Sequence, residues 1–365
     1  MFTVEFSNPA CQDVREVGGK AAGLAEMTAA GLPVAPGFAV TAAAYRRYLD
    51  EAGLRPFTAG VLAGLGTEVN QAAFDDAERT VVKRLGQVPL PEEIAAPIRD
   101  AYAQLCRDAG VADVAVAVRS SATAEDSVGA SFAGEFETWV DIAGAENVVA
   151  YVHKCYVSVF AGRVLSYLAE KRIDPNAIEM AVVIQKTVRA RSAGVMFTLS
   201  PTSGDRSKIV LEASWGLGLS VVGGEVTPDR FVVEKIGLDI AESSPGYKHI
   251  EYRRGDAPQE VAEERRLMLC LTDDEVTALA GMGKRLEKIH NSPQDIEFAV
   301  DDELPDGNNL ILLQCRPETV WSNAVRKPVF DASAGMMSWI TGSISGNPAT
   351  SATDAAGVHN HSHQH

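Results

Sequence analysis

The order of strands and helices is the feature that most limits the folds open to this chain. Its second half contains four short β-rich segments joined by Gly, Ser, Pro and Asp turns, at 179–188, 193–201, 208–216 and 229–237. One helix, predicted at 272–290, separates these segments from two final strands at 295–302 and 308–317. A doubly wound sheet would need strict alternation of strand and helix. The sequence therefore predicts an α+β fold.

The first half is largely helical and contains a strand that we expect to be buried. In this strand, DVAVAVRSSA at 113–122, valine and alanine alternate before a polar loop. A chain of 365 residues is too long for one simple core and suits two or three packed lobes. We expect an N-terminal lobe at 1–180, a C-terminal lobe at 181–325 and a flexible tail, rich in Ser, Thr, Gly and Ala, at 326–365.

Charge and cysteine usage argue against several classes of protein. A formal net charge of -16 disfavours a nucleic-acid reader, which normally has a basic face. An anionic ligand such as a nucleotide would need a local cluster of cations and backbone N–H groups. Five scattered cysteines without a CxxC pair indicate reduced thiols and a cytoplasmic protein. We find no signal peptide and no apolar stretch near the roughly 20 residues that span a bilayer, so we expect no membrane role.

The segment Gly18-Gly19-Lys20 is the first candidate for binding phosphate. Glycine lets the backbone approach a phosphate closely, and a lysine at a helix start adds charge where the helix N-terminus already favours anions. The helix that follows is expected to stop at Gly31. The segment is not a P-loop, because GxxxxGK[ST] is absent. For these three residues alone, a surface turn with a solvated lysine is the simpler interpretation.

The second candidate is the segment 116–138, in which Arg119 ends the buried strand. An arginine at that position is more easily explained as a ligand clamp than as a solvated charge. The residues that follow supply hydroxyl, carboxylate and backbone N–H groups: Ser120, Ser121, Thr123, Glu125, Asp126 and, in the loop 131–134, Ser131 and Gly134. The alternative is a polar strand-to-helix loop whose arginine pairs with an aspartate of the same loop.

The third candidate lies on the two final strands. Asp295 and Glu297 are two residues apart and therefore share one strand face. Gln314 and Arg316 have the same spacing in the next strand. Neighbouring strands would then present carboxylate, amide and guanidinium groups together, and hard oxygen ligands suit Mg²⁺. An exposed polar face with a salt bridge is the alternative.

The fourth candidate is a glycine-rich stretch that begins at Glu212 and continues through 223–229. A loop of this composition between strands could close over a nucleotide. A lone glycine-rich loop indicates little by itself.

In this order the four candidates form the pattern of a known family. The N-terminal domain shared by phosphoenolpyruvate synthase, pyruvate phosphate dikinase and rifampin phosphotransferase has successive signatures that resemble GGKAAGLAEM, GLPVAPGFAVT, AVRSSATAED, SFAGEFET, SAGVMFTLSP, ASWGLGLSVVGGEVTPDRF, QDIEFA and ILLQCRPETV. The resemblance runs from about residue 15 to residue 321, which is most of the chain.

The resemblance implies that ATP and Mg²⁺ bind between two lobes of an ATP-grasp-like fold. Lys20 and Arg119 would hold the β- and γ-phosphates, and Arg316 would neutralise phosphate charge. Glu297 and Gln314 would bind Mg²⁺. The other expected ATP contacts are Thr123, Ser131 and Gly134 near the phosphates, Gln185, Lys186, Thr187 and Val188 at the adenine, and Glu212 at the ribose or a second metal.

The family also implies a histidine that receives the phosphoryl group. Its members pass a pyrophosphoryl group from ATP to a histidine on a swivelling domain, and in the synthase branch Pi is released and AMP remains. The carrier motif, Thr-Ser-His in a glycine-rich context, and the pyruvate-binding barrel are not found in this sequence. We expect His153 to be packed or solvated, and His249, His290 and the histidines of the tail do not resemble the motif.

These departures lead to the expectation of a subunit that acts with a phosphohistidine carrier subunit in trans. The small ATP-binding subunits of phenylphosphate synthases are arranged in this way, and phenol is then the expected acceptor. The alternatives are the ATP-binding domain of a phosphoenolpyruvate synthase or rifampin phosphotransferase expressed alone, or a nucleotide-binding regulator without catalysis.

Overall fold

The computed structural model describes residues 1–322, apart from 52, 65–70, 124–137, 172–177 and 256. Residues Met1–Ser322 form one compact unit. The predicted tail at 326–365 lies outside the described residues, as do Ser131 and Gly134 of the predicted phosphate loop. The unit contains two large antiparallel sheets with helices packed on them, so the prediction of an α+β fold is confirmed.

The first sheet has the strand order β1-β2-β5-β3-β4, and all its pairs are antiparallel. Its strands are β1 (Thr3–Glu5), β2 (Gly37–Val40), β3 (Val116–Ala122), β4 (Thr138–Ile142) and β5 (Met180–Lys186). Val116 and Val118 of β3 alternate with Arg119 and Ser121, which lie on the opposite face. The valines belong to the first hydrophobic core.

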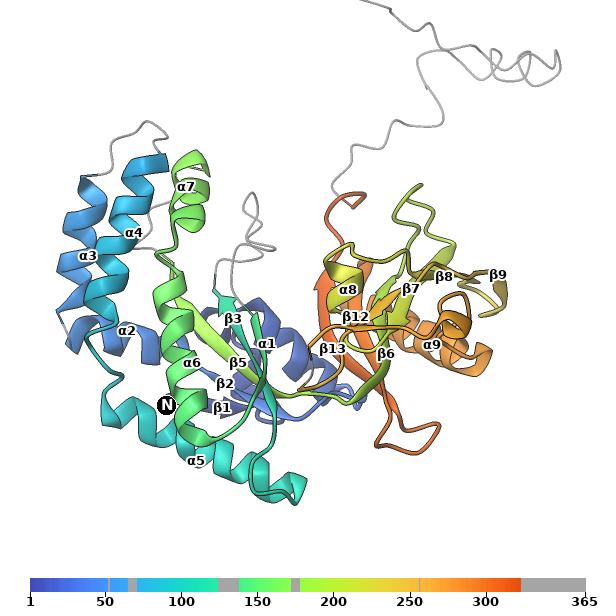
Figure 1. Ribbon diagram of the computed structural model, residues 1–365, viewed down its shortest axis with the longest axis horizontal. Coiled ribbons are helices and arrows are strands. Elements are labelled where there is room, and N and C mark those ends of the chain that lie inside the picture. The colour runs from blue at the N-terminus through green and yellow to red at the C-terminus, as the bar shows by residue number, and fades with distance from the viewer. Residues whose placement is uncertain (52, 65–70, 124–137, 172–177, 256, 323–365) are drawn as a thin grey trace, which may run out of the picture. The chain divides into compact units, whose positions relative to one another are not determined.

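Six helices pack around this core (Figure 1). They are α2 (Ala42–Glu51), α3 (Leu54–Ala63), α4 (Gln71–Leu85), α5 (Glu92–Ala109), α6 (Ala145–Ser158) and α7 (Gly162–Lys171). Tyr48 and Tyr156, from α2 and α6, are fully buried and stack with ring centroids 5.8 Å apart. Aromatic pairs of this kind stabilise a core beyond the area that they bury.

The second sheet has the order β13-β12-β6-β7-β8-β9 and is also antiparallel. Its strands are β6 (Ala190–Phe197), β7 (Lys208–Trp215), β8 (Asp229–Glu234), β9 (Ile240–Ser244), β12 (Gln294–Asp301) and β13 (Leu310–Pro317). The short elements beside it are α8 (Leu219–Val222), β10 (Ile250–Glu251) and β11 (Gln259–Glu260).

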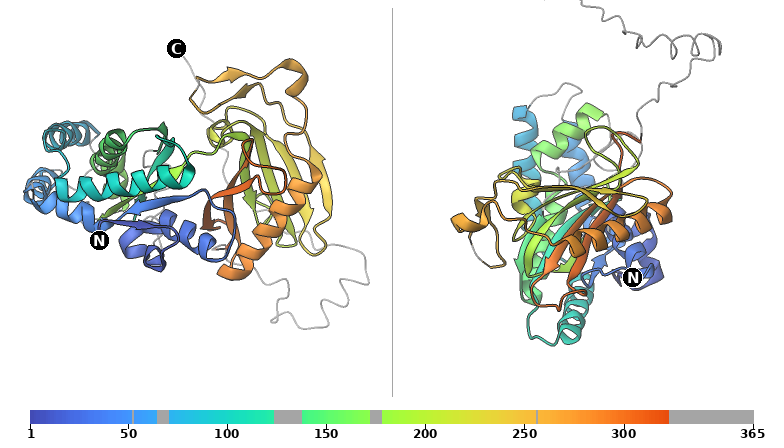
Figure 2. Two further views of the ribbon diagram at one scale, coloured as in Figure 1. Left: turned by 90° about the horizontal axis from the view of Figure 1, so that it is seen from below. Right: turned by 90° about the vertical axis from the view of Figure 1, so that its right-hand side faces the viewer.

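Helix α9 (Asp273–His290) runs along one face of the second sheet (Figure 2). Thr272 and Glu275 form a capping box that satisfies backbone donors at its first turn. Met196 and Ile296 are paired across β6 and β12 and share the second hydrophobic core with residues of α9. Glu297 is next to Ile296 in the strand and therefore lies on the face opposite α9.

Helix α1 (Val14–Ala29) packs against a strand of each sheet. Gly18 interrupts it with φ +72°, and a Cβ at this position would lie 2.3 Å from the carbonyl oxygen of Ser121 on β3. A Cβ on Gly23 would lie 2.9 Å from the carbonyl oxygen of Cys315 on β13. The helix ends as predicted, with Gly31 at φ +68° just beyond it.

The expected boundary between residues 180 and 181 falls at the start of β5. It assigns β5 to the C-terminal lobe, whereas this strand pairs with β2 and β3 in the centre of the first sheet. A continuous apolar run predicts a buried strand but does not identify its neighbours, because pairing depends on contacts far along the chain. The two sheets are therefore separated by the segment after Lys186.

Two further expectations concern the state of the cysteines and the presence of membrane-spanning helices. All five cysteines are buried and none forms a disulfide, in line with the expectation of reduced thiols. Among the described helices, none alone has the length and apolar character to cross a membrane, although α6 and the first part of α7, bent by 41°, have them together.

Replacing Gly18 by alanine tests the approach of α1 to β3. Gly31→Ala is the matched control, because Gly31 also has positive φ but has no atom within 4 Å of the added Cβ. We expect Gly31→Ala to lower the free energy of unfolding by about 1 kcal/mol through backbone strain. Gly18→Ala should lower it by about 2 kcal/mol more, through the clash with β3 and because ψ 168° at positive φ is open only to glycine. Urea unfolding measures both, and equal losses would contradict the contact.

Candidate functional site

Arg119 extends from the first sheet to the second. Its Nη2 donates to Glu297 Oε2 of β12 over 2.9 Å, and its Nη1 donates to the carbonyl of Leu313 over 3.3 Å. The Arg119 side chain is only 15% exposed. An arginine this far removed from water is not a solvated surface charge. The carboxylate that it contacts is Glu297, while Glu125 and Asp126 of its own loop lie outside the described residues.

Glu297 belongs to a row of side chains that crosses the second sheet. The strand register pairs Glu297 with Gln314 on one side and with Val195 on the other, and Val195 pairs with Glu212. Residues directly opposite each other in a sheet lie on the same face. Glu212, Glu297 and Gln314 therefore share the face opposite α9. The sequence spacing groups Asp295 with Glu297, and Gln314 with Arg316. The strand register adds Glu212 to the same row as Glu297 and Gln314.

Asp295 and Arg316 form the next pair on this face. Their strand positions are directly opposite, and Arg316 Nε lies 3.6 Å from Asp295 Oδ2. The Arg316 side chain is 45% exposed, so the guanidinium remains accessible. The predicted convergence of these two residues with Glu297 and Gln314 is thus present in the structure.

Three buried polar atoms in this region have no hydrogen-bond partner among the described residues: Arg119 Nε, Asp295 Oδ1 and Gln314 Oε1. Buried polar atoms are almost always paired, so a group of unpaired ones requires an explanation. The two oxygens, with the Glu297 carboxylate between them in the register, are the donor set that Mg²⁺ prefers. The guanidinium N–H suits a phosphate oxygen. The residues present therefore fit a metal-bound phosphate.

The segment 18–20 lies beside this group. Ser121 Oγ donates to the carbonyl of Val17 over 2.8 Å, which holds the helix kink against β3 two residues from Arg119. Regular α1 geometry resumes after Gly18, so Lys20 is in the first turn beyond the kink. Backbone N–H groups and a lysine at such a turn favour an anion. The role of Lys20 stays a prediction.

Three hydrogen-bond donors of the segment predicted to contact adenine, residues 185–188, already have acceptors within the protein. The N–H groups of Lys186 and Thr187 donate to the carbonyls of Pro36 and Ala115, and the Gln185 side chain, which is 2% exposed, donates to the carbonyl of Ala35. Val188 packs in a small apolar cluster with Ala193, Ala299 and Ile311. The contact of this segment with adenine stays a prediction.

Two other predicted residues have contacts within the protein. Thr123 is held by Glu179, whose carbonyl accepts from the Thr123 N–H over 3.0 Å. His153 is packed, as predicted: its Nε2 lies 2.8 Å from the Tyr48 hydroxyl, and burial lowers its pKa. Its ring also meets Tyr48 edge-on.

Asp295 is the residue whose importance sequence reasoning understated. Its spacing from Glu297 singled it out, but no role was assigned to it. Burial raises the pKa of Asp295 to about 6, with an opposing effect of Arg316 and a reinforcing effect of Glu318. Such a shift marks a carboxylate that folding has deprived of water, and groups of this kind concentrate at functional sites.

The Asp295 carboxyl predicts a pH dependence of stability. Because its pKa is higher in the folded than in the unfolded protein, it stabilises the fold at low pH, and this contribution is lost as the pH rises from about 4 to about 6. We expect Asp295→Asn to raise the free energy of unfolding near pH 7 by about 2 kcal/mol and to change it little near pH 4. Urea unfolding without Mg²⁺ measures this, with exposed Asp302→Asn as the control. A pH-independent effect would contradict it.

Comparison with known proteins shows the family to which this sequence is similar. A family model described as "Pyruvate phosphate dikinase, AMP/ATP-binding domain" matches residues 14–335. The chain is 40% identical over 334 residues to a phosphoenolpyruvate synthase of Aeropyrum pernix, covering 84% of this chain and 41% of that protein. It is 41% identical over 330 residues to a probable phosphoenolpyruvate synthase of Methanothermobacter thermautotrophicus (89% and 47%) and 38% identical over 340 residues to the phosphoenolpyruvate synthase of Neisseria meningitidis (88% and 42%).

The alignments cover most of this chain but only part of each relative. The chain spans less than half the length of each of these three relatives, so it corresponds to only one part of them. The matched family region includes every residue of the group around Arg119, Glu297 and Gln314. The chain belongs to the pyruvate phosphate dikinase AMP/ATP-binding domain family.

Proposed function

We propose that this protein binds Mg-ATP in an ATP-grasp-like arrangement and transfers a pyrophosphoryl group, of which one phosphoryl group is retained, to a histidine of a carrier subunit in trans. The contact between Arg119 of the first sheet and Glu297 of the second carries the proposal. It joins a guanidinium suited to phosphate with a carboxylate suited to Mg²⁺, beside the unpaired oxygen of Gln314. Family membership supports ATP as the nucleotide.

Binding Mg-ATP would exchange the partners of this ion pair. Arg119 would turn from Glu297 to the phosphates, and Glu297 and Gln314 would become ligands of Mg²⁺, with Asp295 beside them. Lys20 and Arg316 would add positive charge, since phosphoryl transfer depends mainly on positioning and charge neutralisation. When bound, Mg²⁺ would supply further neutralisation of the phosphate oxygens.

The proposed reaction balances as follows. A nitrogen of the carrier histidine attacks the β-phosphorus, the bond to the α-phosphate oxygen breaks, and AMP leaves with that oxygen. Water then cleaves the pyrophosphoryl group and releases the γ-phosphate as Pi, so the histidine keeps the former β-phosphate. ATP, water and histidine thus give AMP, Pi and phosphohistidine.

The final acceptor is the least constrained part of the proposal. The relatives named above are phosphoenolpyruvate synthases, and the chain matches less than half of each. We propose phenol as the acceptor, as in phenylphosphate synthases, with the reaction in the cytosol. The five cysteines, none of which forms a disulfide, support that compartment. The alternative is the ATP-binding domain of a phosphoenolpyruvate synthase or rifampin phosphotransferase.

Product analysis with labelled ATP tests the proposal. The full chain is incubated with Mg-ATP, with and without the product of each neighbouring gene as a candidate carrier. We expect carrier-dependent AMP and Pi, label from [γ-³²P]ATP in Pi, and label from [β-³²P]ATP on the carrier. Formation of ADP alone would show an ordinary kinase or ATPase, and phenylphosphate would appear only when phenol is the acceptor.

Arg119→Gln should lower kcat/KM for AMP formation by at least about 100-fold, because a charged donor to the transferred phosphate is lost. Arg79→Gln on α4 is the matched control, since its ion pair with Asp76 is fully on the surface. Circular dichroism checks that both variants fold. Equal activity of the two variants would refute the role of Arg119.

Glu297→Gln should raise the Mg²⁺ concentration needed for half-maximal ATP binding by about tenfold or more, because a neutral amide replaces a charged ligand. Calorimetric titration with ATP at several Mg²⁺ concentrations measures this shift. Glu303→Gln provides the control, since the Glu303 side chain is 40% exposed and lies beyond the end of β12. An unchanged Mg²⁺ requirement would remove Glu297 from the metal site.

A further inference from the structure

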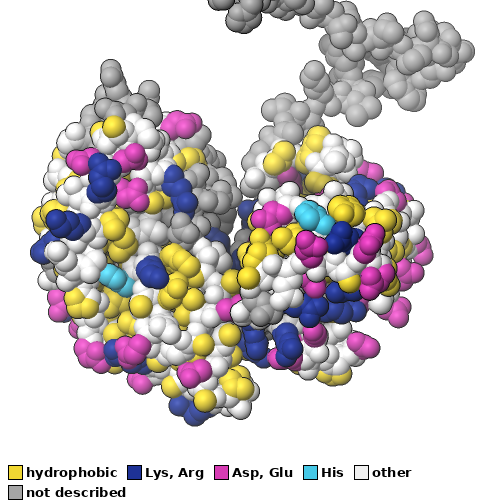
Figure 3. All heavy atoms as spheres, viewed as in Figure 1, with side chains coloured by type: hydrophobic (Ala, Val, Ile, Leu, Met, Phe, Trp, Pro, Cys, Tyr) yellow, Lys and Arg dark blue, Asp and Glu magenta, His cyan; other side chains and the backbone are white. Residues whose placement is uncertain are grey.

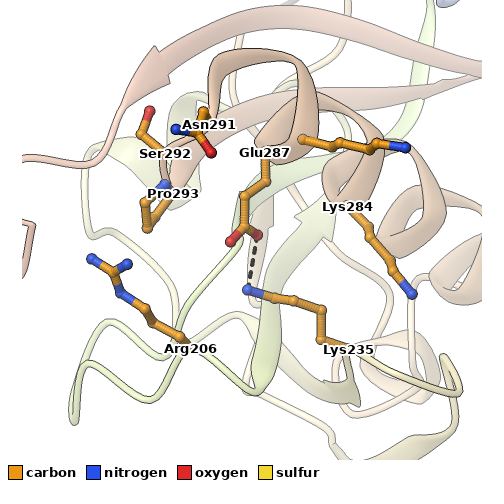
Figure 4. Close-up of a pocket in the computed structure, with 8 residues that line it drawn as sticks. Arg206, Lys235, Lys284, Glu287, Asn291, Ser292 and Pro293 are labelled. Atoms are coloured by element: carbon orange, nitrogen blue, oxygen red, sulfur yellow. Dashed lines mark ion pairs between the residues drawn. The ribbon is translucent and has the colours of Figure 1, made fainter.

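A basic pocket of about 340 Å³ lies at the C-terminal end of α9 (Figure 4). Its lining contains four cationic side chains, Arg206, Lys235, Lys284 and Lys288, and one carboxylate, Glu287. This excess of positive charge occurs in a chain with a net charge of -16. On the face of the molecule in Figure 3, by contrast, positive and negative side chains are interspersed.

Tertiary contacts bring these residues together from distant segments. Arg206 precedes β7 and Lys235 follows β8, and the Lys235 N–H donates to the carbonyl of Ser207 over 2.8 Å, which closes this end of the hairpin. Lys284 and Lys288 lie one helical turn apart on α9 and therefore share one of its faces. The convergence of cations is thus built into the fold and is not a charge run in the sequence.

Lys235 makes two contacts within the protein and keeps a third N–H available as a donor. Its side chain is 14% exposed, its Nζ lies 2.8 Å from Glu287 Oε2, and it also donates to the carbonyl of Thr198. An ammonium group has three donors, so one remains after these two contacts. In Figure 4, Arg206 extends toward Ser292 and Pro293, while the amine of Lys284 points away from Glu287.

The pocket is chemically suited to an anion with several oxygens. Guanidinium and ammonium groups are donors only, and the lining has four cations against one carboxylate. Outside the lining, the Asp205 carboxylate interacts electrostatically with Lys235, and the Lys284 amine donates to the carbonyl of Ile236. A concave site of one sign concentrates counter-ions, and arginine matches phosphate with two parallel N–H bonds. The volume lies at the small end of the range for ligand sites.

The pocket does not belong to the site for Mg-ATP. It is lined by α9 residues, and α9 covers the face of the second sheet that carries Met196 and Ile296. Glu297 and Gln314 lie on the opposite face. We propose that this pocket is a separate site for a phosphate group, of inorganic phosphate or of a small phosphate ester, independent of the function proposed above.

Calorimetric titration of the full chain with inorganic phosphate and with glycerol 3-phosphate, at constant ionic strength, tests the site. We expect saturable binding of at least one anion, weakened about tenfold or more by Arg206→Gln/Lys288→Gln, because charge-assisted hydrogen bonds are lost. Arg79→Gln/Lys83→Gln on α4 has the same change of charge and should leave the affinity within about twofold. The anion that binds more tightly identifies the source of the phosphate.

Two further variants distinguish binding in the α9 pocket from binding beside Arg119. Lys235→Gln should weaken the same binding, and Arg119→Gln should leave it unchanged if the anion occupies the α9 pocket. Absence of saturable binding by both anions would overturn the proposal. So would binding that Arg119→Gln abolishes and Arg206→Gln/Lys288→Gln retains, because the anion would then occupy the opposite face of the sheet.

Discussion

The contact of helix α1 with one strand of each sheet is the constraint on which the arrangement of the site depends. Gly18 lies against Ser121 of β3, and Gly23 lies against Cys315 of β13, at distances that leave no room for a Cβ. One helix thereby fixes the strand that carries Arg119 and the strand that carries Gln314. The ion pair between Arg119 and Glu297 then joins the two sheets, although these two residues are 178 positions apart in the sequence.

The same arrangement leaves some polar atoms buried without partners among the described residues, which is unfavourable for stability. Arg119 Nε, Asp295 Oδ1 and Gln314 Oε1 have been removed from water but make no hydrogen bond among the described residues. Burial also raises the pKa of Asp295. The stability lost here is consistent with a site selected for function.

Much of the fold could be predicted from local signals. The helix expected at 272–290 is observed at Asp273–His290, because a capping box marks its start and apolar residues recur at helical spacing. The helix stop at Gly31 follows from the left-handed backbone that glycine tolerates. The location of β5 could not be predicted in this way, because its continuous apolar sequence suits the centre of either sheet.

The sequence by itself determined the types of elements, the α+β class and the polar residues that alternate with apolar ones on β3, β12 and β13, since these follow from periodicity within a few residues. Tertiary structure alone decided that Arg119 contacts Glu297, that Glu212 joins the row through Val195, and that the backbone donors of Lys186 and Thr187 are already used. It also decided that Arg206 and Lys235 share a pocket with α9. Each of these depends on strand register and helix packing between distant segments, which no local pattern encodes.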